Sequence, residues 1–127
     1  MKIRILILML LVSVCPVFAA QSVPLPRLVD LGATKCIPCK QMVPVLAALK
    51  SEYAGQLEVV FLDVWENSAA GKPYGIRLIP TQVFFDAAGK ELYRHEGYWS
   101  KAAIVAKFKE LGVTLTPPPV SKDGKAP

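Results

Sequence analysis

The stretch that decides the fold is Thr34-Lys35-Cys36-Ile37-Pro38-Cys39-Lys40, in which two residues separate a pair of cysteines. Proline is favoured in the first turn of a helix, so Pro38 fits a helix start. The apolar residues after it recur at helical spacing to about residue 53. The mostly apolar run 27–31 just before the pair is typical of a buried strand. The sequence therefore predicts a strand, a loop with the cysteines, and a helix that opens between them.

The rest of the chain extends this unit into a sheet. Further strands are expected at residues 57–64, 81–85 and 91–95, and Ser100 is expected to cap a final helix. The continuous apolar centre of 57–64 indicates a strand that is covered on both faces. A strand–helix–strand unit gives a parallel pair, and the closing hairpin is antiparallel. We expect an α/β fold with a central mixed four-stranded sheet flanked by helices.

The sequence predicts that both ends of the chain lie outside the folded domain. Residues 1–19 have the layout of a secretory signal peptide, with a basic start, an apolar run and small residues before a cut after Ala19. A retained membrane anchor is the alternative, although Pro16 interrupts the run before the roughly 20 apolar residues that a spanning helix needs. Residues 20–114 are then the single domain, and 115–127 a proline-rich disordered tail.

Loss of the signal would change the cysteine count and the charge. It removes Cys15, whose lipidation is a weaker alternative to cleavage, and also the basic residues Lys2 and Arg4. The remaining basic residues are scattered and do not alternate with aromatic ones, so we expect no nucleic-acid partner. An exported protein meets an oxidising compartment, where its two remaining cysteines are normally oxidised unless something keeps reducing them.

Metal binding and haem attachment are not expected at the cysteine pair. A structural zinc site needs four ligands, usually in two close pairs, and His95 is the only other soft candidate. Haem attachment needs a histidine after the second cysteine, where this chain has Lys40. We expect no metal and no other cofactor. A purely structural disulfide is the remaining alternative, but a bridge over two residues closes a tiny loop and stabilises the fold little.

The start of a helix supplies the chemistry of a redox pair. Backbone N–H groups in the first turn are unpaired and together carry roughly half a positive charge. Cys36 precedes that turn, so its thiolate, the reactive form, is stabilised, and Lys35 adds a positive charge beside it. Cys39 lies inside the turn and is shielded. We therefore expect Cys36 to be the nucleophile and Cys39 to resolve the mixed disulfide.

Over about residues 27–112 the chain resembles the thioredoxin family. Five features carry the resemblance: the Cys-x-Pro-Cys-Lys motif at 36–40, Asp30 on the preceding strand, Pro44 where the active-site helix bends, the segment 74–81 that leads to the family's cis-proline at Pro80, and Gly97 beside the substrate groove. The resemblance implies a short thioredoxin-like fold, since the strand and helix that open many members are missing here.

The resemblance also implies roles for individual residues. Asp30 would be buried and would relay a proton from Cys39 during resolution, and the backbone of Ile79 would pair with an extended substrate segment. The implied substrate-binding residues are Ile37, Pro38, Ile79, Pro80, Gly97 and Tyr98. Tyr98 and its neighbour Trp99 either form part of that surface or pack against the last helix.

Four positions depart from the family pattern. Lys35 and Gly32 stand where thioredoxins usually have tryptophans, Ile37 replaces the glycine between the cysteines, and Phe61 replaces the lysine near the buried acid. These changes bear on redox potential and partner choice and leave the disulfide chemistry in place.

The expected function is thiol–disulfide exchange outside the cytoplasm, in a bacterial periplasm. By family analogy the Ile37-Pro38 dipeptide favours a reductase of protein disulfides, which then needs an electron source such as a membrane-embedded thiol transporter. An oxidase or isomerase is the alternative within this class, and a binding or carrier module without turnover is the alternative outside it. We expect a monomer whose partners are protein thiols and disulfides.

Overall fold

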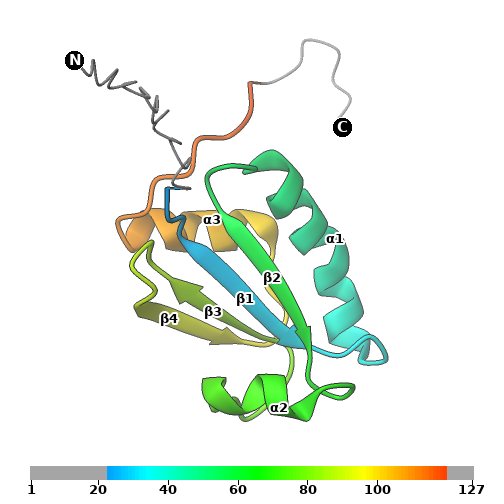
Figure 1. Ribbon diagram of the computed structural model, residues 1–127. Coiled ribbons are helices and arrows are strands. Elements are labelled where there is room, and N and C mark those ends of the chain that lie inside the picture. Colours follow the sequence, from blue (N-terminus) through cyan, green and yellow to red (C-terminus); the bar gives the residue numbers. More distant parts are fainter. Residues whose placement is uncertain (1–22, 120–127) are drawn as a thin grey trace, which may run out of the picture.

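The computed structural model describes residues 23–119, which form a mixed four-stranded sheet with the order β2-β1-β3-β4 (Figure 1). The strands are β1 (Arg27–Gly32), β2 (Glu58–Asp63), β3 (Thr81–Phe85) and β4 (Glu91–Glu96). β1 pairs in parallel with β2 and antiparallel with β3, and β3 pairs antiparallel with β4. The expected mixed sheet with a closing hairpin is confirmed.

Helical segments cover both faces of this sheet. The long helices α1 (Ile37–Glu52) and α3 (Lys101–Glu110) pack on one face. The short helix α2 (Ser68–Gly71) and a 3-10 turn (Lys72–Tyr74) belong to the segment that packs on the other. The α/β class and the flanking helices expected from the sequence are therefore confirmed.

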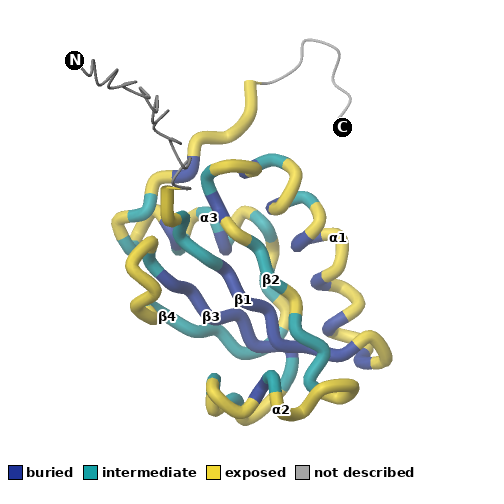
Figure 2. Tube along the Cα trace, viewed as in Figure 1, coloured by how far each residue is buried: buried dark blue, intermediate teal, exposed yellow. Residues whose placement is uncertain are grey.

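Two apolar clusters make up the core because strand side chains alternate between faces. Leu28 and Phe84 join α1 and α3 in the larger cluster, whereas Val29 and Val83 point to the opposite side. Figure 2 shows the buried residues concentrated in the central strands β1 and β3 and the intermediate ones along β2 and β4. The carboxyl end of β1, where the cysteine loop begins, is thus anchored from both faces.

β2 has apolar neighbours on both faces, as its sequence suggested: Val59 packs against the larger cluster, and Val60 and Leu62 pack against the smaller one. The strand lies at an edge of the sheet, however, and none of its residues is fully buried. Phe61 in its centre keeps 40% of its surface exposed. An apolar run shows that a strand has apolar neighbours, but it does not show whether a further strand lies beyond it.

The domain extends slightly beyond its expected end at residue 114. Leu115 is buried in the larger core cluster, and the backbone of Thr116 exchanges two hydrogen bonds with the side chain of Gln56. The expected boundary is corrected to include these two residues. The expected signal peptide and most of the expected tail lie outside the described residues. Within residues 23–119 no helix has the length and apolar character needed to cross a membrane.

Candidate active site

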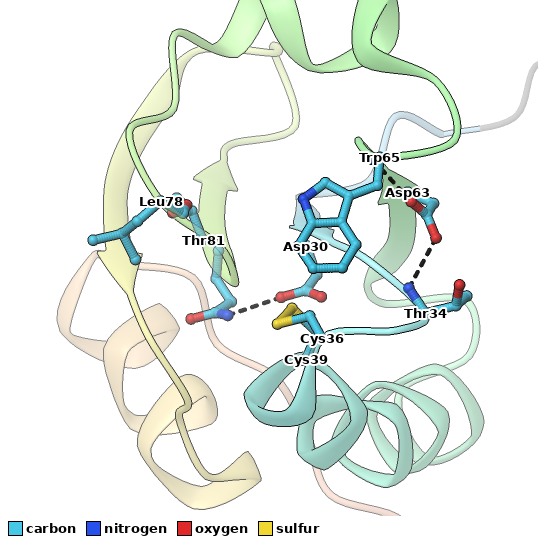
Figure 3. Close-up of a disulfide and its surroundings, with 9 residues drawn as sticks. Asp30, Thr34, Cys36, Cys39, Asp63, Trp65, Leu78 and Thr81 are labelled. Carbon is cyan, nitrogen blue, oxygen red and sulfur yellow. Dashed lines mark hydrogen bonds between the residues drawn. A yellow bond between two sulfur atoms is a disulfide. The ribbon is translucent and has the colours of Figure 1, made fainter.

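The two cysteines lie at the beginning of α1 and form a disulfide (Figure 3). Cys36 is the N-cap residue with extended backbone angles, and Cys39 lies in the first turn, with 5.2 Å between their Cα atoms. Cys36 is 8% exposed and Cys39 2%, while Ile37 between them is 75% exposed. Cys36 is the more accessible sulfur residue, as expected, although the difference in the disulfide form is small.

The electrostatics of the helix start favour an anion at Cys36. α1 has no acidic residue in its first turn and no side-chain cap. The free N–H groups of that turn therefore present their partial positive charge toward Cys36. Lys35 and Lys40 flank the pair and are exposed. When the disulfide is reduced, this setting stabilises a thiolate at Cys36.

The segment before β3 packs against the disulfide. The peptide bond between Ile79 and Pro80 is cis, as the sequence resemblance implied. Ile79 packs on the small cluster that contains both cysteines, and the N–H of Gly97 donates to the carbonyl of Pro80 at 2.7 Å. Gly97 has φ +97, a conformation that favours glycine. Ile79, Pro80 and Gly97, which are distant in sequence from the cysteines, are thus brought to the same site.

Asp30 is a fully buried acid on β1 whose carboxyl points toward the disulfide (Figure 3). Burial raises its pKa to about 6, against a smaller lowering effect of a hydrogen bond from Gln82. The side-chain Nε2 of Gln82 donates to Oδ1 of Asp30 at 2.8 Å. Among the described residues no lysine or arginine forms an ion pair with Asp30. Its pKa allows Asp30 to take up or release a proton near neutral pH.

A second acid, Asp63, joins the two loops that border the disulfide. Its carboxylate accepts the N–H of Thr34 at 2.8 Å and those of Trp65 and Glu66 at 3.0 Å. These hydrogen bonds lower the pKa of Asp63, and the bond from Thr34 has the largest effect, followed by the bond from Glu66. Trp65 is 62% exposed and extends from this turn into the surroundings of the disulfide (Figure 3). Sequence reasoning missed Asp63 and Trp65; a tryptophan directly after a strand was the only available signal.

Phe61 and Gly32 depart from the family pattern together. A side chain at Gly32 would bring its Cβ within 3.1 Å of the Phe61 ring and 3.3 Å of Cys39 Cβ. The ring therefore occupies the space that a larger residue at position 32 would need. An apolar cavity of about 220 Å³ lies beside the Phe61 ring. Its lining residues are Ala33, Thr34, Cys39, Lys40, Val43, Leu46 and Phe61.

The two aromatic residues after Gly97 have separate positions. Trp99 packs edge-on against Phe84 in the core, and His95 stacks on Trp99 with 4.0 Å between ring centroids. Tyr98 remains 47% exposed. Of the two alternatives, Trp99 therefore takes the core position and Tyr98 stays available at the surface. Within residues 23–119 no three histidine, cysteine or acidic side chains gather as metal ligands.

The sequence model of the thioredoxin family matches residues 20–110. The chain belongs to the thioredoxin family. Its cysteine pair, placed at the start of α1 and able to form a disulfide, makes it a redox protein of that family.

Two thioredoxin relatives show how far the similarity extends. The chain is 37% identical over 86 residues to the bifunctional thioredoxin reductase/thioredoxin of Mycobacterium leprae, which covers 68% of this chain and 19% of that protein. It is 42% identical over 59 residues to a Staphylococcus aureus thioredoxin, with 46% of this chain and 57% of that protein covered. The matched part thus spans only a fraction of either relative.

Similarity to a solved structure supports the thioredoxin-like fold. A structure described as that of a malarial protein superposes with a TM-score of 0.63 over 68% of this chain and 96% of the other. The sequence identity is 16%, so this likeness concerns the fold alone.

Proposed function

We propose that this thioredoxin-family protein is an exported reductase of protein disulfides. The observation that carries the proposal is the placing of a cysteine pair at an uncapped helix start, with Ile79 packed against it and buried Asp30 behind it. A structural bridge needs neither the free N–H groups nor a buried acid that titrates near neutral pH. The arrangement suits sulfur exchange in water at neutral pH.

The first step is the attack of the Cys36 thiolate on a disulfide of the substrate protein. One substrate sulfur forms a new bond to Cys36 Sγ, and the other leaves as a thiolate and takes a proton from water. The substrate segment binds in extended form along the backbone of Ile79. Four exposed apolar side chains provide the contact surface around it: Ile37, Trp65, Leu78 and Tyr98.

The second step releases the substrate. Asp30 in its carboxylate form accepts the proton of the Cys39 thiol, and the resulting thiolate attacks Cys36 Sγ. The Cys36–Cys39 disulfide forms, the mixed disulfide breaks, and the second substrate sulfur leaves as a thiolate that is then protonated. Two electrons have passed from the cysteine pair to the substrate, which leaves with two thiols.

The cycle closes when another dithiol reduces the Cys36–Cys39 disulfide. We infer that the donor outside the cytoplasm is a membrane-embedded thiol transporter, because a periplasmic protein cannot draw on cytoplasmic reductants directly. The basis for export is the layout of residues 1–19. The preference for reduction rests on the Ile37-Pro38 dipeptide and on family analogy.

An insulin reduction assay tests the proposed activity. We expect turnover with a chemical dithiol as donor and none with Cys36→Ser, which would leave binding intact. A protein that binds substrate without turnover in this assay is a carrier. Asp30→Asn should slow the second step and so accumulate trapped mixed disulfide. The redox state of the pair in living cells, reduced for a reductase and oxidised for an oxidase, tests the direction.

A further inference from the structure

Gln82 is a buried amide on the face of the sheet that α1 and α3 cover. It is 0% exposed and shares this face with Phe84, two residues further along β3. Burial of an amide costs free energy unless its polar atoms are hydrogen-bonded. Within residues 23–119 the side chain makes a single hydrogen bond, from Nε2 to Oδ1 of Asp30 at 2.8 Å. Its Oε1 is buried and has no partner in this part of the chain, so the bond to Asp30 is the one that satisfies the amide.

The hydrogen bond makes the two oxygens of Asp30 different. Oδ1 accepts from Gln82, whereas Oδ2 is buried and has no partner in the described part of the chain. A protonated carboxyl has one hydroxyl oxygen and one carbonyl oxygen, and the carbonyl oxygen is the better acceptor for an amide N–H. The proton of the neutral acid is therefore favoured on Oδ2.

We propose that Gln82 is a positioning residue, whose amide holds Oδ1 of Asp30 and leaves Oδ2 as the oxygen that takes up the proton of Cys39 and gives it back. The inference rests on the proton-transfer role proposed for Asp30 and adds how the sheet presents that carboxyl. The same N–H bond stabilises the carboxylate. Gln82 thus keeps Asp30 able to ionise at a site whose burial favours the neutral acid.

The register of the sheet shows why Gln82 is suited to this role. Phe61, Asp30, Gln82 and His95 stand opposite one another across β2, β1, β3 and β4. Of the two residues directly beside Asp30 in this row, Phe61 is apolar and Gln82 is polar. In the cysteine loop, the first turn of α1, the end of β2 and the position opposite Gln82 on β4, the titratable groups are Lys35, Cys36, Cys39, Lys40, Asp63 and His95. None of these is hydrogen-bonded to Asp30 within residues 23–119.

The test follows the side-chain carboxyl of Asp30 by carbon NMR while the pH of the disulfide form is varied. In this form neither cysteine titrates, so the Asp30 midpoint is measured without coupling to a thiol. Gln82→Met replaces the amide by an apolar side chain of similar length. Loss of a hydrogen bond to the charged form should raise the midpoint by about one pH unit or more.

A matched control is the same substitution at the far end of the domain. Gln56→Met also removes a glutamine that is hydrogen-bonded, here to Thr116, and should leave the Asp30 midpoint where the parent has it. If Gln82→Met does not fold, Gln82→Asn keeps an amide but shortens its reach, and the same rise is expected. A midpoint that stays the same or falls in the folded Gln82 variant overturns the inference.

A kinetic measurement separates this inference from the proposed activity. In the reduced protein, the pH profile for resolution of the mixed disulfide should move upward in Gln82→Met in step with the NMR midpoint. If the NMR shift is found but the parent reduces no disulfide, the reductase proposal fails and the effect of Gln82 on Asp30 stands. If the parent is active and the NMR midpoint does not move, the role of Gln82 is wrong and the activity stands.

Discussion

The carboxylate of Asp63 accepts the backbone N–H of Thr34 at 2.8 Å and so ties the end of β2 to the loop before Cys36. Its other oxygen holds the turn that carries Trp65. We expect Asp63→Ala to lower the melting temperature by several degrees and to speed amide hydrogen exchange at Thr34 and Trp65. Substrate reduction should fall several-fold, because both loops border the disulfide. Unchanged exchange at these two amides would contradict this account.

Asp63→Asn provides the graded control for that prediction. The asparagine keeps one acceptor oxygen but loses the charge, so its effect should be smaller than that of alanine. The lowered pKa of Asp63 means that its carboxylate stabilises the fold above the pKa of the unfolded chain. That contribution is lost as the pH falls through the folded-state pKa. The deficit of Asp63→Asn should therefore shrink in acid.

A crowding prediction concerns Gly32 and Phe61. The Cβ of Gly32→Ala would lie 3.1 Å from the Phe61 ring and 3.3 Å from Cys39 Cβ. Such overpacking typically costs about 1–3 kcal/mol, which urea unfolding of the disulfide form can measure. Phe61 lies on the edge strand β2, and Phe61→Leu replaces its ring by a smaller side chain. This change should relieve the crowding at position 32. The double variant should then lose less stability than the two single losses added together, whereas strict additivity would rule out the contact.

The sequence predicted the parts of the site that depend on local pattern. The motif at 36–40 placed the cysteines at a helix start, because the proline and the helical spacing of the following residues lie within one segment. The burial of Asp30 followed from the resemblance to thioredoxins, which placed this acid on the strand before the cysteines. The cis bond before Pro80 followed from resemblance and not from any local physical signal.

The sequence did not predict contacts that depend on register across the sheet. Asp30 and Gln82 are 52 positions apart, and alternation along β3 assigns a face only when the pairing is known. The edge position of β2 was missed for the same reason, since strand order is a property of the whole sheet. The packing of Leu115 was missed because the prolines after it dominate the local composition.

A labelling prediction concerns the reduced pair. Cys36 lies at the N-cap and is the more exposed cysteine, at 8% against 2% for Cys39. Cys36 should therefore react with limiting iodoacetamide much faster than Cys39, because the helix start stabilises its thiolate and its side chain is the less buried of the two. Peptide mapping by mass spectrometry gives the ratio. Equal labelling, or a preference for Cys39, would reverse the assigned roles.

A processing prediction concerns the first residues of the chain. Expressed with its own leader in a bacterial host, the exported protein should begin at or near Ala20, since the layout of residues 1–19 is that of a signal peptide. Intact-mass measurement of the periplasmic fraction decides the question. A chain that keeps Met1 and remains with the membranes would instead mean an anchor.

The two acids near the disulfide should affect stability in opposite ways as the pH rises. The pKa of Asp30 is raised from 3.8 to about 6 in the folded protein, so the unfolded chain releases this proton first. The contribution of Asp30 to stability is therefore fully present below the unfolded-state pKa and is lost between about pH 4 and pH 6. The loss amounts to about 3 kcal/mol, since each unit of pKa difference corresponds to about 1.4 kcal/mol.

Asp30→Asn removes this titration and should be more stable than the parent above about pH 7, where burial of the parent's carboxylate is most costly. Its advantage should shrink toward pH 4, where the parent carboxyl is neutral. Urea unfolding of the disulfide forms at both pH values measures the difference without interference from the thiols. Asp63→Asn, measured alongside, should instead gain relative to the parent as the pH falls. An advantage of Asp30→Asn that is equal at both pH values would mean that burial does not raise the pKa of Asp30, and its proposed part in proton transfer would lose its physical basis.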